Sequence, residues 1–191
     1  MDLAQQERDK YETMWENNDY RKFSPGERFI WPFLMEARPL PGSTIFDFGV
    51  GCGRAALFFL KAGFDVWGVD IADNCLDPEV APELSDRLLV ACLWDDDLSL
   101  GQADYIYCTD VMEHIPEDKV DAVLKNIAKH SKQAFLNISF VDDEFGETIG
   151  ETLHLTVHDF KWWIEKLEKY FNILLGKDMI TGGTFYVEAL R

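Results

Sequence analysis

Positive charge is scarce in this sequence. Lys and Arg together number 18 against 35 Asp and Glu, which gives a formal net charge of −17 at pH 7. The imbalance is steepest between Asp65 and Asp121, where only Arg87 and Lys119 oppose 16 acidic residues. A nucleic-acid backbone is bound through clusters of Lys and Arg, and the sequence has no such cluster. DNA is therefore excluded as a partner.

Long hydrophobic runs and paired cysteines are missing as well. No window approaches 18 uninterrupted apolar residues, and the first dozen residues contain no apolar core of a signal peptide. Four cysteines stand singly, without a CxxC pair: Cys52, Cys75, Cys92 and Cys108. Buried free thiols are expected in place of disulfides or zinc ligands. These absences predict a soluble, cytoplasmic protein that does not associate with a membrane.

The N-terminal 42 residues favour helices. The whole chain has 191 residues, 47% of them hydrophobic, which suits one domain with a full core and leaves too little for a second. A first helix is predicted over residues 3–20. A capping box at Ser24–Glu27 places Pro25 at the first position of a second helix. Pro32 is expected to bend that helix, and Pro39–Gly42 to end it.

From Thr44 onward, short apolar runs alternate with stretches of helical period, which is typical of βαβ units around a parallel sheet. Helices are predicted over Pro116–His130 and from Phe160 to Phe171. The last two strands are joined only through Lys177–Gly183, too short for a crossover helix, so they should pair as a hairpin. Seven strands are predicted: Thr44–Phe48, Asp65–Val69, Leu88–Leu93, Tyr105–Thr109, Ala134–Ser139, Asn172–Leu175 and Thr184–Leu190. We therefore expect an α/β fold with a seven-stranded, mostly parallel sheet, helices on both faces and a C-terminal antiparallel hairpin.

A glycine turn follows the first strand. Gly49, Gly51 and Gly53 lie between that strand and the helix that begins at Arg54. Such a turn holds a ligand against backbone at the carboxyl edge of a sheet. The dinucleotide fingerprint needs a small residue where Arg54 stands, so a nicotinamide oxidoreductase is disfavoured. Asp47 at the strand end would repel a pyrophosphate and attract an ammonium or sulfonium group, which favours a cationic ligand.

Asp70 ends the second strand, about 20 residues after the glycine turn, where an acid commonly binds both hydroxyls of a ribose. That placement selects an adenosine-type ligand. A ligand that is an adenosine and also cationic at sulfur and amine is S-adenosylmethionine (SAM). The residues thus predict SAM as the cofactor.

These motifs resemble those of class I SAM-dependent methyltransferases. The likeness rests on D-x-G-x-G-x-G from Asp47 to Gly53, on Asp70, and on the segment Asp110–Pro116 after the fourth strand. It implies a methyltransferase domain over residues 43–191 and a helical lid over residues 1–42 that excludes water, with an ordinary docked helix as the alternative. The family places an acid near adenine after strand three, and the run Asp95–Asp97 leaves open which one faces the base. The resemblance implies these cofactor-binding residues: Asp47, Gly49, Gly51, Gly53, Asp70, Ile71, Trp94, Asp95 and Thr109.

Two histidines are the candidate catalytic residues. His154 is expected in a loop at the mouth of the site, where it would be the general base for a hydroxyl acceptor, and His114 is the second candidate. Asp110, Glu113 and His114 would share one side of a helical turn and, with His154, could bind a divalent metal. The segment is similar to E-x-x-E-H plus a later His in metal-dependent small-RNA 2′-O-methyltransferases and some ubiquinone-pathway O-methyltransferases, with Asp110 in the first position. Metal-free class I enzymes also carry such a segment, so the metal stays an open alternative.

Four further side chains receive structural interpretations. His130 should close a helix, and His158 should lie on the surface in the first turn of the last long helix. Trp163 is expected in the core. Trp162 points off the apolar stripe, where it would cover an acceptor, form a dimer contact or shield the helix.

The function that we expect is SAM-dependent methyl transfer to a small-molecule or sugar-like acceptor, with oxygen preferred because of His154. Acceptors should enter a pocket formed by residues 15–35 and 140–160. The N-P-P-Y, D-P-P-Y and Pro-Cys segments of DNA base methyltransferases are missing. The sequence assigns no oligomeric state. Two alternatives stay open: a SAM-binding protein without turnover, and an RNA methyltransferase.

Overall fold

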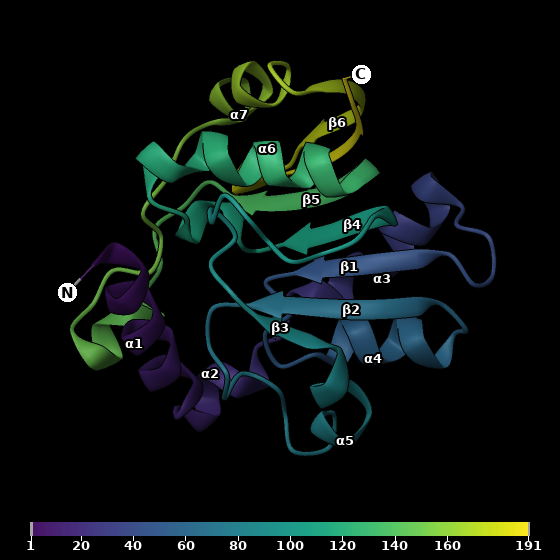
Figure 1. The fold of residues 1–191 in the computed structure, drawn as a ribbon. Helices are drawn as coiled ribbons and strands as arrows, with labels where there is room; N and C mark the ends of the chain where they lie inside the picture. The colour runs from purple at the N-terminus through teal and green to yellow at the C-terminus, as the bar shows by residue number, and fades with distance from the viewer. Residues whose placement is uncertain (1, 191) are drawn as a thin grey trace.

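A seven-stranded sheet forms the centre of the computed structural model, which describes residues 2–190 (Figure 1). The strand order is β3-β2-β1-β4-β5-β7-β6. Strands β1 to β6 share one direction, and β7 runs antiparallel to both of its neighbours. The strands are β1 (Thr44–Phe48), β2 (Asp65–Asp70), β3 (Leu88–Val90), β4 (Ala103–Thr109), β5 (Ser131–Ser139), β6 (Phe171–Asp178) and β7 (Gly182–Ala189). The predicted fold class is confirmed, including the C-terminal hairpin.

The third strand is shorter than predicted. It ends at Val90, and the expected continuation to Leu93 is wrong. The physical reason is a turn: the Cys92 N–H donates to the Asp95 carboxylate at 3.3 Å, and the Asp95 N–H donates to the Cys92 carbonyl at 3.0 Å. Residues 91–94 therefore leave the sheet and border the site described below.

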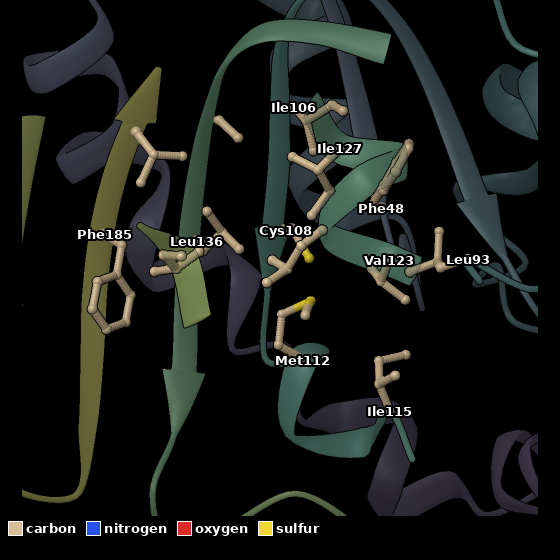
Figure 2. Packing of buried hydrophobic residues seen from close by; sticks show 14 of the residues in the cluster. Phe48, Leu93, Ile106, Cys108, Met112, Ile115, Val123, Ile127, Leu136 and Phe185 are labelled. Carbon is tan, nitrogen blue, oxygen red and sulfur yellow. The ribbon is translucent and has the colours of Figure 1, made fainter. Parts of the chain in front are cut away.

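Alternating side chains of the strands face two helical layers. Phe46 and Phe48 of β1 belong to the core beneath α6 (Val120–His130) and α7 (Phe160–Leu167). Ile45 belongs to the opposite core, beneath α3 (Gly26–Ala37) and α4 (Arg54–Lys61). Figure 2 shows the first core, where Ile106, Cys108 and Leu136 of the sheet meet Val123 and Ile127 of α6. Each large apolar side chain buried in this way contributes about 1.5–3 kcal/mol to folding.

Two helices lie beyond the carboxyl ends of the strands. They are α1 (Leu3–Trp15) and α2 (Asn18–Lys22), found in Figure 1 where the arrowheads of β1, β2 and β4 point. The single helix predicted over residues 3–20 is wrong, because Asn17 ends the first helical run and caps the second by accepting from the Asp19 N–H at 2.9 Å. Among the described helices, none has the length and apolar character needed to cross a membrane.

Helix α3 is fixed to the sheet. Its predicted capping box does not form: Pro25 is the N-cap residue, and no side chain caps the helix. Pro32 lies inside the helix, which ends at Ala37 before Arg38 in the left-handed conformation. The Tyr107 hydroxyl of β4 donates to the Gly26 carbonyl at 2.5 Å, so the first turn of α3 is tied to the middle of the sheet.

The remaining elements are short. They are α5 (Ala81–Leu84) and the 3-10 turns η1 (Ser85–Arg87), η2 (Met112–His114), η3 (Glu117–Lys119) and η4 (Phe145–Ile149). The turn η4 lies beside α1 (Figure 1).

Candidate active site

The glycine turn after β1 has the backbone conformation that glycine permits. Gly49 and Gly51 have φ of +72° and +53°, values that strain other residues. The Gly49 N–H donates to the Val69 carbonyl at 2.8 Å, which holds the turn against β2. A Cβ at Gly49 would collide with the Val111 side chain. The turn thus brings bare backbone to the carboxyl edge of the sheet.

Gly53 has a different place from the other two glycines. It is the N-cap of α4, with φ of +80°, and it does not line the cavities beside the turn. A Cβ there would lie 2.8 Å from side-chain atoms of both Leu76 and Val80. The structure therefore gives Gly53 a packing role beneath the turn.

Asp70 and Asp47 are buried carboxylates on either side of the turn. Asp70 accepts from the Gly51 N–H at 2.9 Å and from the Ala72 N–H at 3.1 Å, so its two oxygens are held in place. Burial raises the pKa of both carboxyls, and for Asp47 the charge of Asp70 raises it further. A cation placed beside Asp47 would offset that cost and favour its ionised form.

A main cavity opens along the turn, with a volume of about 610 Å³ that includes the space at its mouth. Its walls come from the strand ends, from the loop after β4 and from the N-terminal helices. Its lining includes Glu7, Tyr11, Trp15, Asp70, Leu93 and His114. An adjoining cavity, lined by Asp47 and Thr109, shares Trp15, Tyr20, Gly49, Gly51 and Asp110 with the first. The two cavities therefore lie side by side along the glycine turn.

The residues predicted after β2 and β3 separate into two groups. Ile71 and Trp94 line the main cavity. Asp95 is exposed and does not line it, because its carboxylate is turned to the Cys92 N–H. The structure thus brings together every predicted cofactor-binding residue except Gly53 and Asp95.

His114 is partly buried at the side of the main cavity, which it lines. Its Nδ1 lies 3.1 Å from the Leu153 carbonyl and 2.8 Å from the Tyr11 hydroxyl. Because a carbonyl only accepts, Nδ1 carries the hydrogen and Nε2 has the lone pair. Burial, and then the nearby His154, lower the pKa of His114 to about 3, so the ring is neutral at physiological pH.

His154 lies against His114, with ring centroids 4.6 Å apart and nearly perpendicular planes. Its Nδ1 lies 2.6 Å from the Val141 carbonyl and so also donates, which leaves Nε2 as an acceptor. Nitrogen atoms of both rings and a carboxylate oxygen of Glu113 lie within 4.8 Å of one another. Glu113 Oε1 accepts from the Ser139 N–H at 2.8 Å, whereas the buried Oε2 has no hydrogen-bond partner among residues 2–190.

Asp110 does not share a helical turn with these residues, as the spacing predicted. It has φ of +59° and precedes the 3-10 turn η2, which contains Glu113 and His114. That backbone conformation directs Asp110 to the lining of both cavities. Burial raises the pKa of its carboxyl, and the nearby His154 opposes that effect.

The four side chains with structural interpretations mostly behave as expected. His130 closes α6 and lies 3.0 Å from the Gly101 carbonyl, and Trp163 is fully buried. His158 precedes α7, because Asp159 is the N-cap; its predicted place in the first turn is wrong. The ring of Trp162 stacks on the ring of His158, with centroids 4.0 Å apart. Neither residue lines the two cavities.

Sequence reasoning missed Glu7 and Tyr11. Both lie on α1 and line the main cavity. A possible signal was their spacing with Trp15, which puts the three on one face of the helix at four-residue intervals.

Comparison with known proteins gives one family. Residues 13–169 match the model of a methyltransferase domain. The magnesium-protoporphyrin O-methyltransferase of a Synechocystis species is 25% identical over 123 residues, which are 61% of this chain and 52% of the relative. The chain therefore spans about half the length of that curated relative.

Solved structures resemble the whole chain. A magnesium protoporphyrin IX methyltransferase from Synechocystis with bound S-adenosylhomocysteine (SAH) has a TM-score of 0.71 at 18% identity, covering 99% of this chain and all (100%) of that one. The 1,6-didemethyltoxoflavin N1-methyltransferase of Burkholderia thailandensis, with its substrate and SAH, has a TM-score of 0.72 at 12% identity, covering 100% and 92%. At such identities the likeness shows a shared fold.

Proposed function

The chain belongs to the methyltransferase domain family of class I SAM-dependent enzymes, and from that premise we propose that it transfers the SAM methyl group to a hydroxyl of a small-molecule acceptor. The observation that carries the proposal is the pair of buried carboxylates, Asp47 and Asp70, on either side of the positive-φ glycine turn. The magnesium-protoporphyrin and toxoflavin enzymes act on small molecules and support that acceptor class.

In this proposal SAM extends along both cavities. Asp70 binds the ribose hydroxyls, and the turn at Gly49 and Gly51 contacts the sulfur-bearing chain. Asp47 and Thr109 in the adjoining cavity receive the ammonium end of the methionine moiety. Ile71 and Trp94 contact the base. Electrostatic attraction to the two carboxylates distinguishes this cationic cofactor from a nucleoside phosphate.

Methyl transfer then needs an acceptor oxygen in line with the sulfur–methyl bond. The oxygen forms a bond to the methyl carbon while the carbon–sulfur bond breaks, the electron pair stays on sulfur, and SAH is neutral at that atom. His154 Nε2 takes the hydroxyl proton as general base, for which its Nδ1–H bond to Val141 orients the ring. His114, also an acceptor at Nε2, is the second candidate for that step.

The N-terminal helices act as a lid in this proposal. Tyr11, Trp15 and Tyr20 close the cavities on the side away from the sheet. The Arg21 guanidinium donates to the Asn74 and Cys75 carbonyls at 2.5 and 3.0 Å. These bonds hold α2 to the loop after β2. Closure of this kind excludes water from the sulfonium.

The acceptor entrance lies between residues 15–35 and 140–160. Phe145 of η4 lies 5.7 Å from the Tyr20 ring and 5.9 Å from the Phe23 ring, measured between centroids. Aromatic faces of this kind suit the apolar face of a sugar-like or ring-shaped acceptor.

The four buried free thiols suit a reducing compartment, which supports a cytoplasmic location.

A divalent metal is the second candidate feature of the site. A carboxylate oxygen of Glu113 and one ring nitrogen of each histidine lie within 4.8 Å of one another, and such a donor set fits a divalent ion. Glu113, His114 and His154 would hold it, and it would supply a Lewis acid for the acceptor hydroxyl. In that case His154 is a ligand in place of a base.

Calorimetry tests the cofactor first. We expect SAM and SAH to bind, while ATP and NAD do not. Binding of ATP or NAD without binding of SAM would contradict the proposal.

Methyl transfer is then measured with radiolabelled SAM and, as acceptor, either a low-mass cell extract or structured RNA. Product only in the RNA reaction would favour the RNA alternative, and cofactor binding without product in either would favour a binding protein. Turnover unchanged by a chelator and by added divalent ions would exclude the metal.

A further inference from the structure

We propose that Glu7, on the N-terminal helix α1, reads the adenine base by accepting a hydrogen bond from its exocyclic amine. The inference rests on the proposed SAM site and deepens it, because it assigns base recognition to the lid and away from the acid after β3. Glu7 would be a specificity-determining residue for the nucleoside of the cofactor.

The position of the base follows from the position of the ribose. With the ribose on Asp70 and the methionine moiety on the Asp47 side, the base must extend along the main cavity in the other direction. That direction is bordered by Ile71, Leu93 and Trp94, and the loop after β4 supplies Ile115. These apolar side chains offer faces to a flat ring.

Glu7 supplies a carboxylate to this part of the cavity. Its side chain is buried, and it lines the cavity although α1 is remote from β3 in the chain. It lines the same cavity as Leu93 and Trp94, two of the residues that border the base. A carboxylate only accepts, so it matches an amino group and is unfavourable beside a carbonyl oxygen.

The ion pair with Lys10 fixes this carboxylate. Glu7 Oε2 lies 2.5 Å from Lys10 Nζ without hydrogen-bond geometry, and Lys10 also donates to the Thr152 carbonyl at 3.3 Å. Both side chains of the pair are nearly buried, at 6% and 11% exposure. Lys10 thus connects Glu7 to the loop before His154, and the carboxylate retains accepting capacity for a ligand.

Asp95 is the alternative reader of the base. It follows β3, where sequence reasoning placed the adenine contact. Its carboxylate instead accepts from the Cys92 N–H at 3.3 Å, and the residue is exposed outside the cavity lining. The cavity therefore contains one acid at its base end, and that acid comes from α1.

The test compares SAH with S-inosylhomocysteine, in which a carbonyl oxygen replaces the exocyclic amine, by calorimetry. We expect the unmodified protein to prefer SAH by about tenfold or more, the ratio typical of a hydrogen bond to a charged group. Glu7→Gln should narrow the ratio to about threefold or less, because an amide can also donate to the carbonyl. Asp95→Asn is the matched control and should keep the original ratio.

A second variant controls for the Lys10 ammonium, which loses its carboxylate partner in Glu7→Gln. Glu7→Gln combined with Lys10→Met removes both charges of the buried pair, and it should show the same narrowed ratio. The inference is overturned if the unmodified protein shows no preference, if the Glu7 variants keep it, or if Asp95→Asn loses it. Failure of the unmodified protein to bind either nucleoside would instead contradict the proposed SAM site, and this inference with it.

Discussion

The indole ring of Trp15 lies directly over Gly51, so that a Cβ on the glycine would sit 3.1 Å from Trp15 Cη2. Trp15 is the last residue of α1, and Gly51 is in the turn after β1. The lid and the glycine turn are therefore in direct contact at the middle of the proposed cofactor site.

Gly51→Ala tests that contact. The φ of +53° costs an alanine about 1 kcal/mol, and the added methyl group pushes on the indole. We expect both a lower melting temperature and about tenfold weaker SAH binding, measured by calorimetry. Gly63→Ala is the matched control, since Gly63 has φ of +94° with open space around its Cα. It should lose stability alone; an equal loss of affinity in both variants would argue against a specific role of the turn.

Asp47→Asn tests the electrostatic basis of cofactor choice. Loss of the carboxylate should weaken SAH, whose ammonium group it would face, by about tenfold or more. Binding of 5′-methylthioadenosine, which has no amino acid portion, should change little. Calorimetry with both compounds gives the comparison. If both affinities fell equally, Asp47 would act on the fold of the site and not on the ammonium group.

The same variant should change how stability depends on pH. Burial raises the pKa of Asp47 in the folded protein, so its neutral form is favoured there. This contribution to stability is complete below the unfolded pKa, near 4, and is lost as pH rises through the folded pKa. Relative to the unmodified protein, Asp47→Asn should therefore become more stable as pH rises from about 4 to 8. Melting temperatures across that range, without ligand, check the sign.

Asp121→Asn provides the opposite sign as a control. Partial burial opposes the effect, but hydrogen bonds from Lys166 and Tyr170 lower the pKa of Asp121. Its contribution is present above the unfolded pKa and is lost as pH falls. The variant should thus become less stable than the unmodified protein as pH rises. Parallel curves for the two variants would contradict both assignments.

His154→Ala tests the acceptor chemistry. If His154 Nε2 takes the hydroxyl proton, turnover should fall by about 10²–10⁴-fold while SAH affinity stays unchanged. His158→Ala is the control, because His158 is paired with the exposed Glu117 and stacked on Trp162, away from the cavities. Turnover is measured with the acceptor identified from the extract. Retained activity in His154→Ala would remove the residue from the mechanism.

Local pattern was enough to predict the seven strands of the sheet, because each is a short run rich in apolar residues, and β1, β2 and β4 end at or just before a glycine or an aspartate. The hairpin followed from the length of the Lys177–Gly183 connection alone. Likewise Asp47, Gly51 and Asp70 could be placed together, since parallel strands bring their carboxyl ends to one edge.

The contribution of α1 could not be predicted in the same way. Glu7 and Tyr11 reach the cavity because α1 docks across the strand ends, a long-range placement that no local pattern encodes. Asp95 lies outside the cavity lining for a related reason: its carboxylate accepts from the Cys92 N–H and forms a turn, which the run Asp95–Asp97 does not reveal in the sequence. The left-handed backbone of Asp110 was equally invisible in the residue spacing.

The hydrogen bond from Tyr107 to the Gly26 carbonyl separates the N-terminal helices into two groups: α3, which is bonded to the sheet, and α1 and α2, which precede it. Since α3 begins on an anchor in the central sheet, it must follow the rigid body of the domain whenever the cofactor comes or goes. Helices α1 and α2 are held by side-chain contacts at the strand ends, such as Tyr11 with His114 and Arg21 with the Asn74 carbonyl. We therefore expect cofactor exchange to displace α1 and α2 while α3 and the sheet stay in place.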